Sequence, residues 1–117
     1  MEPLEGLLNA CRKACEDCEK ACLACNRHCR AMVKAGMKEH ERSVKLSQDC
    51  SEICRLCASF CARKAPMTPA LAEACLKACV ACGTECRKHT KMAPMAACAM
   101  SCAVCADYCR KTAALKA

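Results

Sequence analysis

The feature that most constrains this chain is the spacing of its eighteen cysteines. The first six follow one another in steps of four, three, four, three and four residues, and the four–three–four spacing then recurs in three quartets. At about 100° per helical residue, the first six positions fall within an arc of about 80°, and each quartet within about 60°. The cysteines are Cys11, Cys15, Cys18, Cys22, Cys25 and Cys29; Cys50, Cys54, Cys57 and Cys61; Cys75, Cys79, Cys82 and Cys86; and Cys98, Cys102, Cys105 and Cys109.

This spacing predicts four helices, each with one row of cysteines along a single face. Pro3 suits a first helical turn, Gly36 suits the residue after a helix, and Thr68 is predicted to cap a helix that Pro69 opens. The short connections favour antiparallel neighbours. We therefore predict one all-α domain over residues 1–117, an antiparallel up-down-up-down four-helix bundle with a Cys-lined core. Its helices are expected over about 3–35, from between 37 and 41 to 64, over about 69–90 and over about 94–114.

The composition supports a core made of sulfur. Leu, Ile, Val and Phe together number only 15 in a chain of 117 residues, and there is no tryptophan. Small secreted disulfide scaffolds are equally rich in cysteine, but they are rich in loops, and this spacing is strictly helical. The N-terminal residues also lack the basic and apolar regions of a signal peptide. We therefore interpret the thiols as reduced and the location as cytoplasmic.

The net charge of +7 falls on the faces away from the cysteines. A nucleic-acid-binding surface would have basic residues interleaved with aromatic ones, but the aromatics are limited to Phe60 and Tyr108. No apolar stretch approaches the length of a membrane span. No nucleophile, base and oxyanion-binding group form a recognisable set. The interpretation is a protein that is not an enzyme and binds neither nucleic acid nor a membrane.

A core of thiols can remain protonated, become oxidised, bind zinc or iron–sulfur clusters, or bind Cu(I), which soft sulfur ligands select. A zinc ion with four unshared thiolates carries a net charge of −2, which is costly to bury without cations, and no Lys or Arg falls on the cysteine rows. One Cu(I) per bridging thiolate leaves the core neutral, which gives on the order of 18 ions. Iron–sulfur clusters, a purely structural core, zinc or general soft-metal detoxification, and a thiol redox module stay as alternatives.

The two ends of the predicted bundle differ. One end collects an apolar plug of leucines: Leu4, Leu7, Leu8, Leu71 and Leu115. The other collects soft and borderline ligands: Met32, Met37, His40, His89, Met92 and Met95. Of these, we select Met32, His89, Met92 and Met95 as possible ligands where copper enters, although end-of-core packing, or a capping or solvated role for His89, also fits. We expect His40 on the surface, His28 solvated, and Ser43 and Ser47 to make that end of their helix polar.

The pattern CxxxCxxCxxxC on four helices, extended to six cysteines on the first, resembles the copper storage protein (Csp) family, and the missing export signal is similar to its cytosolic branch. The resemblance covers essentially the whole chain. It implies a four-helix bundle filled with Cu(I)–thiolate sites, all eighteen cysteines as ligands, and assembly as a homotetramer. It also implies Met and His at an open mouth, and exchange with a copper chaperone or a copper-requiring client. The expected function is the storage and buffering of multiple Cu(I) ions, with one proton released per ion bound and a metal-free protein that is already helical.

Overall fold

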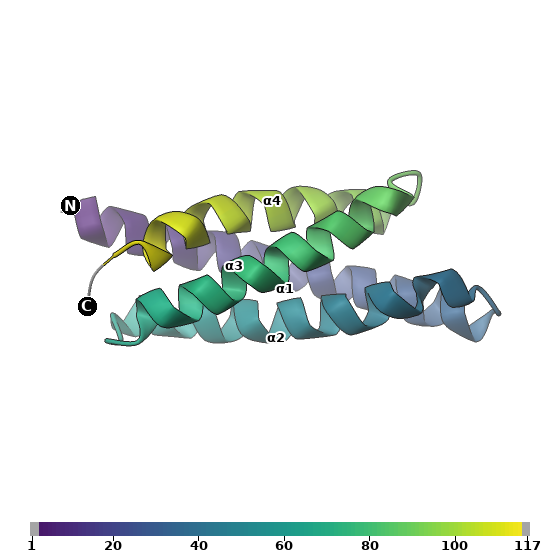
Figure 1. Ribbon diagram of the computed structural model, residues 1–117, viewed down its shortest axis with the longest axis horizontal. Coiled ribbons are helices and arrows are strands. Elements are labelled where there is room, and N and C mark those ends of the chain that lie inside the picture. The colour runs from purple at the N-terminus through teal and green to yellow at the C-terminus, as the bar shows by residue number, and fades with distance from the viewer. Residues whose placement is uncertain (1–2, 116–117) are drawn as a thin grey trace.

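The computed structural model describes residues 3–115, and within this range it consists of four α-helices and two short 3₁₀-helices. The α-helices are α1 (Pro3–Lys34), α2 (Glu41–Arg63), α3 (Thr68–Cys86) and α4 (Ala93–Ala113). The 3₁₀-helix η1 (Lys38–His40) precedes α2, and η2 (Arg87–His89) follows α3. Figure 1 shows the four helices side by side with alternating direction. The predicted all-α antiparallel bundle is confirmed.

Each helix packs against the helices before and after it in the chain, and α4 closes the bundle by packing against α1. The molecule is a rod of 49 × 20 × 17 Å. The α1–α2 and α3–α4 connections meet at one end, and the α2–α3 connection lies at the other end with both chain termini (Figure 1). We call the first end the mouth and the second the closed end.

Two helices end in the Schellman arrangement, in which a left-handed residue allows two backbone hydrogen bonds back to the last turn. After α1, Gly36 has φ of +98° and donates to the Val33 carbonyl, while Met37 donates to Met32. The prediction for Gly36 is therefore confirmed. After α2 the left-handed residue is Lys64, with φ of 53°, a conformation that a residue with a Cβ adopts at a steric cost.

The start of α3 differs from the prediction. Thr68 is not the N-cap: it is the first residue of α3, and Met67 precedes the helix without a side-chain cap. The Thr68 hydroxyl instead donates to the backbone oxygens of Ala65 (2.6 Å) and Phe60 (3.2 Å), because the tight turn brings the end of α2 within its reach. The α-helix also ends at Cys86, earlier than expected, and continues as η2 through His89.

The core consists mainly of the cysteines, all of which are at most 3% exposed. Alanines on the helix flanks, Leu8 and Met95 complete it. At the closed end, Leu7, Leu71 and Leu115 are half-buried, and Leu4, which is 50% exposed, lines a surface pocket there together with Leu8 and Leu115. Within residues 3–115, no helix is both long and apolar enough to cross a bilayer.

Candidate metal centre

The four rows of cysteines face one another along the axis of the bundle, and their sulfur atoms form a continuous lattice. Neighbours on one helix are close, as between Cys18 and Cys22 (Sγ–Sγ 3.8 Å). Contacts between helices are equally short, with Cys15 and Cys105 on α1 and α4 separated by 3.6 Å. The predicted sulfur-lined core is therefore present, and metal sites can form both within and between helices.

The thiols group into tetrads whose four sulfur atoms all lie within 4.8 Å of one another. Five of these tetrads together use fourteen different cysteines, so several cysteines belong to two tetrads at once. The five are Cys11, Cys15, Cys57 and Cys109; Cys15, Cys75, Cys105 and Cys109; Cys18, Cys50, Cys54 and Cys79; Cys18, Cys22, Cys50 and Cys102; and Cys22, Cys82, Cys98 and Cys102. Separate Zn(Cys)₄ sites need four ligands of their own, whereas shared ligands suit bridging thiolates.

The charge environment also disfavours zinc and favours Cu(I). Among residues 3–115, no Lys or Arg is buried with the thiols, so the net charge of several zinc tetrads would not be compensated. Every cysteine is a free thiol, and none is paired in a disulfide across this described range. Hydrogen bonding to Cys86 raises the pKa of Cys25 to about 11, and burial raises the pKa of Cys29 to about 12. Thiols with raised pKa values are neutral before metal binds.

The lattice changes character at the mouth, where α2 contributes hydroxyls in place of thiols. Ser43 and Ser47 are buried there, and they make this end of α2 polar, as the sequence predicted. The cysteine sulfur atoms at this end of the lattice are those of Cys25, Cys29 and Cys86. The Sγ atom of Cys29 lies 3.9 Å from the Sδ atom of Met95. Met95 thus continues the row of α1 and α3 sulfurs toward the mouth.

The two histidines of the mouth lie against each other, with ring centroids 4.6 Å apart. His40 is only 2% exposed, so the expected surface position is wrong: its ring packs against His89, a residue far away in the sequence. His40 Nδ1, His89 Nε2 and the Ser43 hydroxyl are buried polar atoms with no hydrogen-bond partner. Such groups are costly unless a ligand or water satisfies them.

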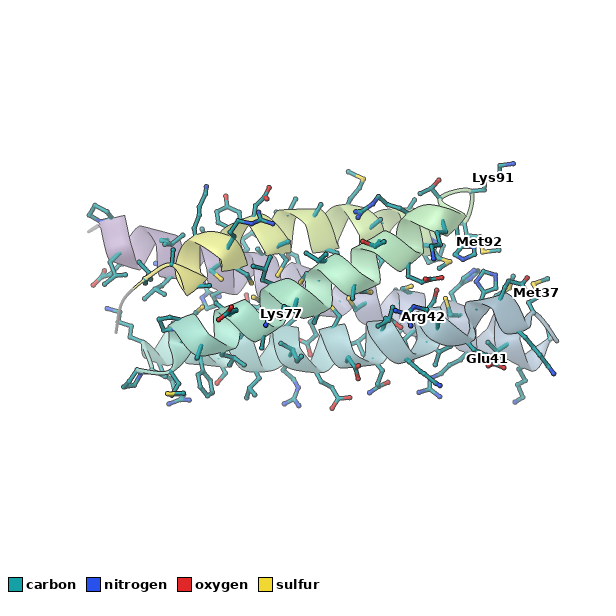
Figure 2. All side chains as sticks on the ribbon, in the orientation of Figure 1. Met37, Glu41, Arg42, Lys77, Lys91 and Met92 are labelled. Carbon is teal, nitrogen blue, oxygen red and sulfur yellow. The ribbon has the colours of Figure 1, made fainter. Side chains whose placement is uncertain are left out.

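Methionines lie at the same end of the bundle. Met92 is half-buried, and its Sδ atom lies 3.2 Å from His28 Nε2, so His28 is also half-buried where we expected it to be solvated. Met32 is half-buried and Met37 is exposed. Figure 2 shows Met92 on the α3–α4 connection and Met37 on the α1–α2 connection, both at the mouth end. The structure therefore places Met32, His89, Met92 and Met95 at one end of the sulfur lattice.

Comparison with known proteins decides the family. The sequence model of Csp, described as copper storage protein, matches residues 5–114. The chain belongs to this family. Among curated protein sequences, none matches this Csp chain.

Solved structures agree with this assignment. Apo-Csp3, copper storage protein 3 from Bacillus subtilis, is 35% identical with a TM-score of 0.80, over 91% of this chain and 98% of that one. Cu(I)-bound BsCsp3 gives a TM-score of 0.81 at 35% identity, over 92% and 99%. A cytosolic copper storage protein from Streptomyces lividans with five coppers gives 0.86 at 27% identity, over 97% and 98%.

Two polar groups of this Csp chain were not singled out from the sequence. Glu85 is 7% exposed at the mouth, where its carboxylate pairs with Lys88 (3.0 Å), Arg42 (3.6 Å) and His89 (3.8 Å). The i+3 and i+4 positions of Lys88 and His89 were a signal for part of this cluster. The Asn26 amide donates to the Val44 carbonyl (2.9 Å) and to Ser47 (3.2 Å).

Proposed function

We propose that this chain stores and buffers Cu(I), at about one ion per cysteine, in the cytoplasm. The observation that carries the proposal is the lattice of eighteen buried, uncrosslinked thiols, of which at least fourteen form tetrads that share members. A bridging thiolate binds two Cu(I) ions, so shared membership fits a stoichiometry near 1:1 and a neutral core. The names of the solved relatives, Cu(I)-bound among them, support the same metal.

The experiment is an anaerobic titration of the reduced protein with Cu(I), and separately with Zn(II), each against a strong competing chelator. Saturation near one copper per cysteine supports storage with all eighteen cysteines as ligands. Tight saturation at four or five zinc ions, with weaker copper binding, would favour zinc detoxification instead. A variant with Cys98, Cys102, Cys105 and Cys109 changed to Ala removes one row and should lower the copper count by about four, by the same coordination counting.

We also propose the mouth as the place where copper enters. Met92 and His89 would receive the ion, and Met95 would pass it to Cys29, 3.9 Å away. From there the ion reaches Cys25 and Cys86 by exchange between neighbouring thiolates. The Nε2 atom of His89 supports this route: it has no hydrogen-bond partner and lies 3.8 Å from the Glu85 carboxylate, so a bound Cu(I) would satisfy it.

The route predicts a kinetic effect without a large change in capacity. Met92→Leu and Met95→Leu should slow copper loading, while the final copper count falls by no more than about one ion for each ligand removed. Met67→Leu is the matched control, since Met67 is an exposed methionine at the closed end. Unchanged loading rates in the mouth variants, with a normal final count, would place the point of entrance elsewhere.

Assembly as a homotetramer is a further part of the proposal. Met100 is 73% exposed and Val104 is exposed beside it on α4, and together with Ala14 of α1 they line one shallow surface pocket. Exposed apolar groups of this kind often mark contacts between subunits. Light scattering of the metal-free protein tests the assembly: Met100→Glu should yield a smaller particle, and Met67→Glu should not.

A further inference from the structure

The positive charge of the protein is concentrated at the mouth. Segments 27–45 and 85–91 contain nine Lys and Arg residues and three Asp and Glu residues, a formal charge of +6 out of +7 for the whole chain. Both segments belong to the mouth: they include the end of α1, η1, the start of α2, the end of α3 and η2. The rest of the bundle is therefore almost neutral, and the positive electrostatic potential is strongest at the mouth.

This field affects the form in which copper can approach. A free or cationic Cu(I) species is repelled by the mouth, whereas an anionic complex is attracted and steered toward it. The buried Glu85 carboxylate offsets only part of the charge, because it faces both Lys88 and Arg42. Both of these cations are mostly exposed, so they act on an approaching ligand.

A pocket of about 300 Å³ opens at this end and is lined by Lys88, His89, Thr90, Lys91 and Met92. It combines two ammonium groups, which bind carboxylates, with an imidazole and a thioether, which bind Cu(I). Its volume suits a small ligand. Figure 2 shows Lys91 and Met92 on the same connection at the mouth end, and both residues line this pocket.

We propose that this pocket, the mouth pocket, takes up Cu(I) as a small anionic complex with carboxylate-bearing thiols, whose carboxylates contact Lys88 and Lys91. The proposal rests on the storage function proposed above and specifies the chemical form of its substrate. Once the complex is bound, Met92 and His89 lie beside its metal, where they can displace the carrier thiolates one at a time.

The exchange is balanced without any change of oxidation state. A Cu(I) ion with two carrier thiolates reacts with two protonated cysteines to give a Cu(I) ion with two cysteine thiolates and two free carrier thiols. Two copper–sulfur bonds break and two form, and the two cysteine protons leave on the carrier thiols. Copper remains Cu(I) throughout, so the step needs no oxidant or reductant.

The experiment compares two carriers that share the thiolate donor but differ in charge. Cu(I) is presented either as its anionic complex with mercaptosuccinate or as its cationic complex with cysteamine, anaerobically and at low ionic strength. Loading is followed by rapid desalting and metal analysis. The variants are Lys88→Gln/Lys91→Gln and its matched control Lys20→Gln/Lys77→Gln, which removes the same charge from exposed sites farther along the rod. Lys91→Glu alone leaves the Lys88–Glu85 pair intact.

We expect the wild type to load faster from mercaptosuccinate than from cysteamine, and the difference to vanish at high salt. Lys88→Gln/Lys91→Gln should slow loading from mercaptosuccinate on the order of tenfold. Lys91→Glu should act in the same direction, and the control should match the wild type. Equal loading from both carriers, or equal effects of the mouth variant and its control, would overturn the proposal. A final copper count far below one per cysteine in the wild type would instead refute the storage function itself.

Discussion

The pH dependence of copper binding gives a quantitative test of the thiol lattice. In the metal-free protein the thiols at the mouth are protonated at neutral pH, because hydrogen bonding and burial raise the pKa of Cys25 to about 11 and of Cys29 to about 12. Each of these two thiols therefore releases one proton when it becomes a thiolate ligand. The binding free energy should strengthen by about 1.4 kcal/mol per pH unit for every proton released.

The slope of this dependence reports how the thiolates are shared. If every thiolate bridges two coppers, one proton leaves per copper, and two pH units change the affinity about 100-fold. If each copper has two thiolates of its own, two protons leave per copper and the slope doubles. The tetrads that share Cys15 and Cys109, or Cys18 and Cys50, predict the smaller slope at full loading.

The assay is competition for Cu(I) against bathocuproine disulfonate between pH 6 and pH 10, with the protein reduced and free of oxygen. A peptide of residues 75–86 contains one quartet with solvent-exposed thiols and is the control. Its slope should level off near the ordinary thiol pKa of about 8.5, whereas the slope of the folded protein should continue to higher pH. A copper affinity that does not change with pH below pH 8 would show that the thiols are already ionised. A pH dependence that levels off at the same pH as that of the peptide would show that burial does not raise the pKa of the thiols. Either result would refute the reasoning.

Three further predictions concern the stability of the metal-free protein. The pKa values of Cys29 and Cys61 are raised from 9.0 to about 12, so above pH 9 the folded state keeps protons that the unfolded chain loses. The free energy of unfolding should therefore be unchanged below about pH 9 and fall between pH 9 and 12, which circular dichroism as a function of pH would show. A stability at pH 12 equal to that at pH 7 would contradict this prediction. Gly83→Ala places a methyl group 3.1 Å from the Cβ of Cys102, an atom that no side-chain rotation can move. The cost of overpacking should exceed the gain of about 1 kcal/mol in helix propensity, so the free energy of unfolding in anaerobic urea titrations should fall by about 1 kcal/mol. A more stable variant would show that α3 and α4 can move apart without cost. Asn26→Ala removes the hydrogen-bond donor to Val44 and Ser47 and the acceptor for Arg30. The free energy of unfolding, measured by the same titration, should fall by about 1–3 kcal/mol, with little change in the number of copper ions bound. An unchanged stability would mean that water replaces the amide.

The sequence alone determined the helices and the direction of every thiol. Helical periodicity is a local property, so the four–three–four spacing assigns each cysteine to one face before any packing is known. It also determined that Ser43 and Ser47 continue the α2 row in hydroxyl form, and that Gly36 ends α1. Pro69 and Pro94 marked the starts of α3 and α4 to within a residue. The fold class and the family both follow from these positions.

The tertiary structure decided what depends on the contacts between helices. His40 is buried against the ring of His89, which belongs to a distant part of the sequence, and the contact of His28 with Met92 joins α1 to the α3–α4 connection. The level at which Cys25 meets Cys86 depends on the axial offset of α1 and α3, which no periodicity within one helix can specify. Loop geometry and side-chain packing set that offset, because they fix the position of each helix along the axis of the bundle. The sequence therefore placed each sulfur on its helix, and only the fold decided which sulfurs lie close enough to share a metal ion.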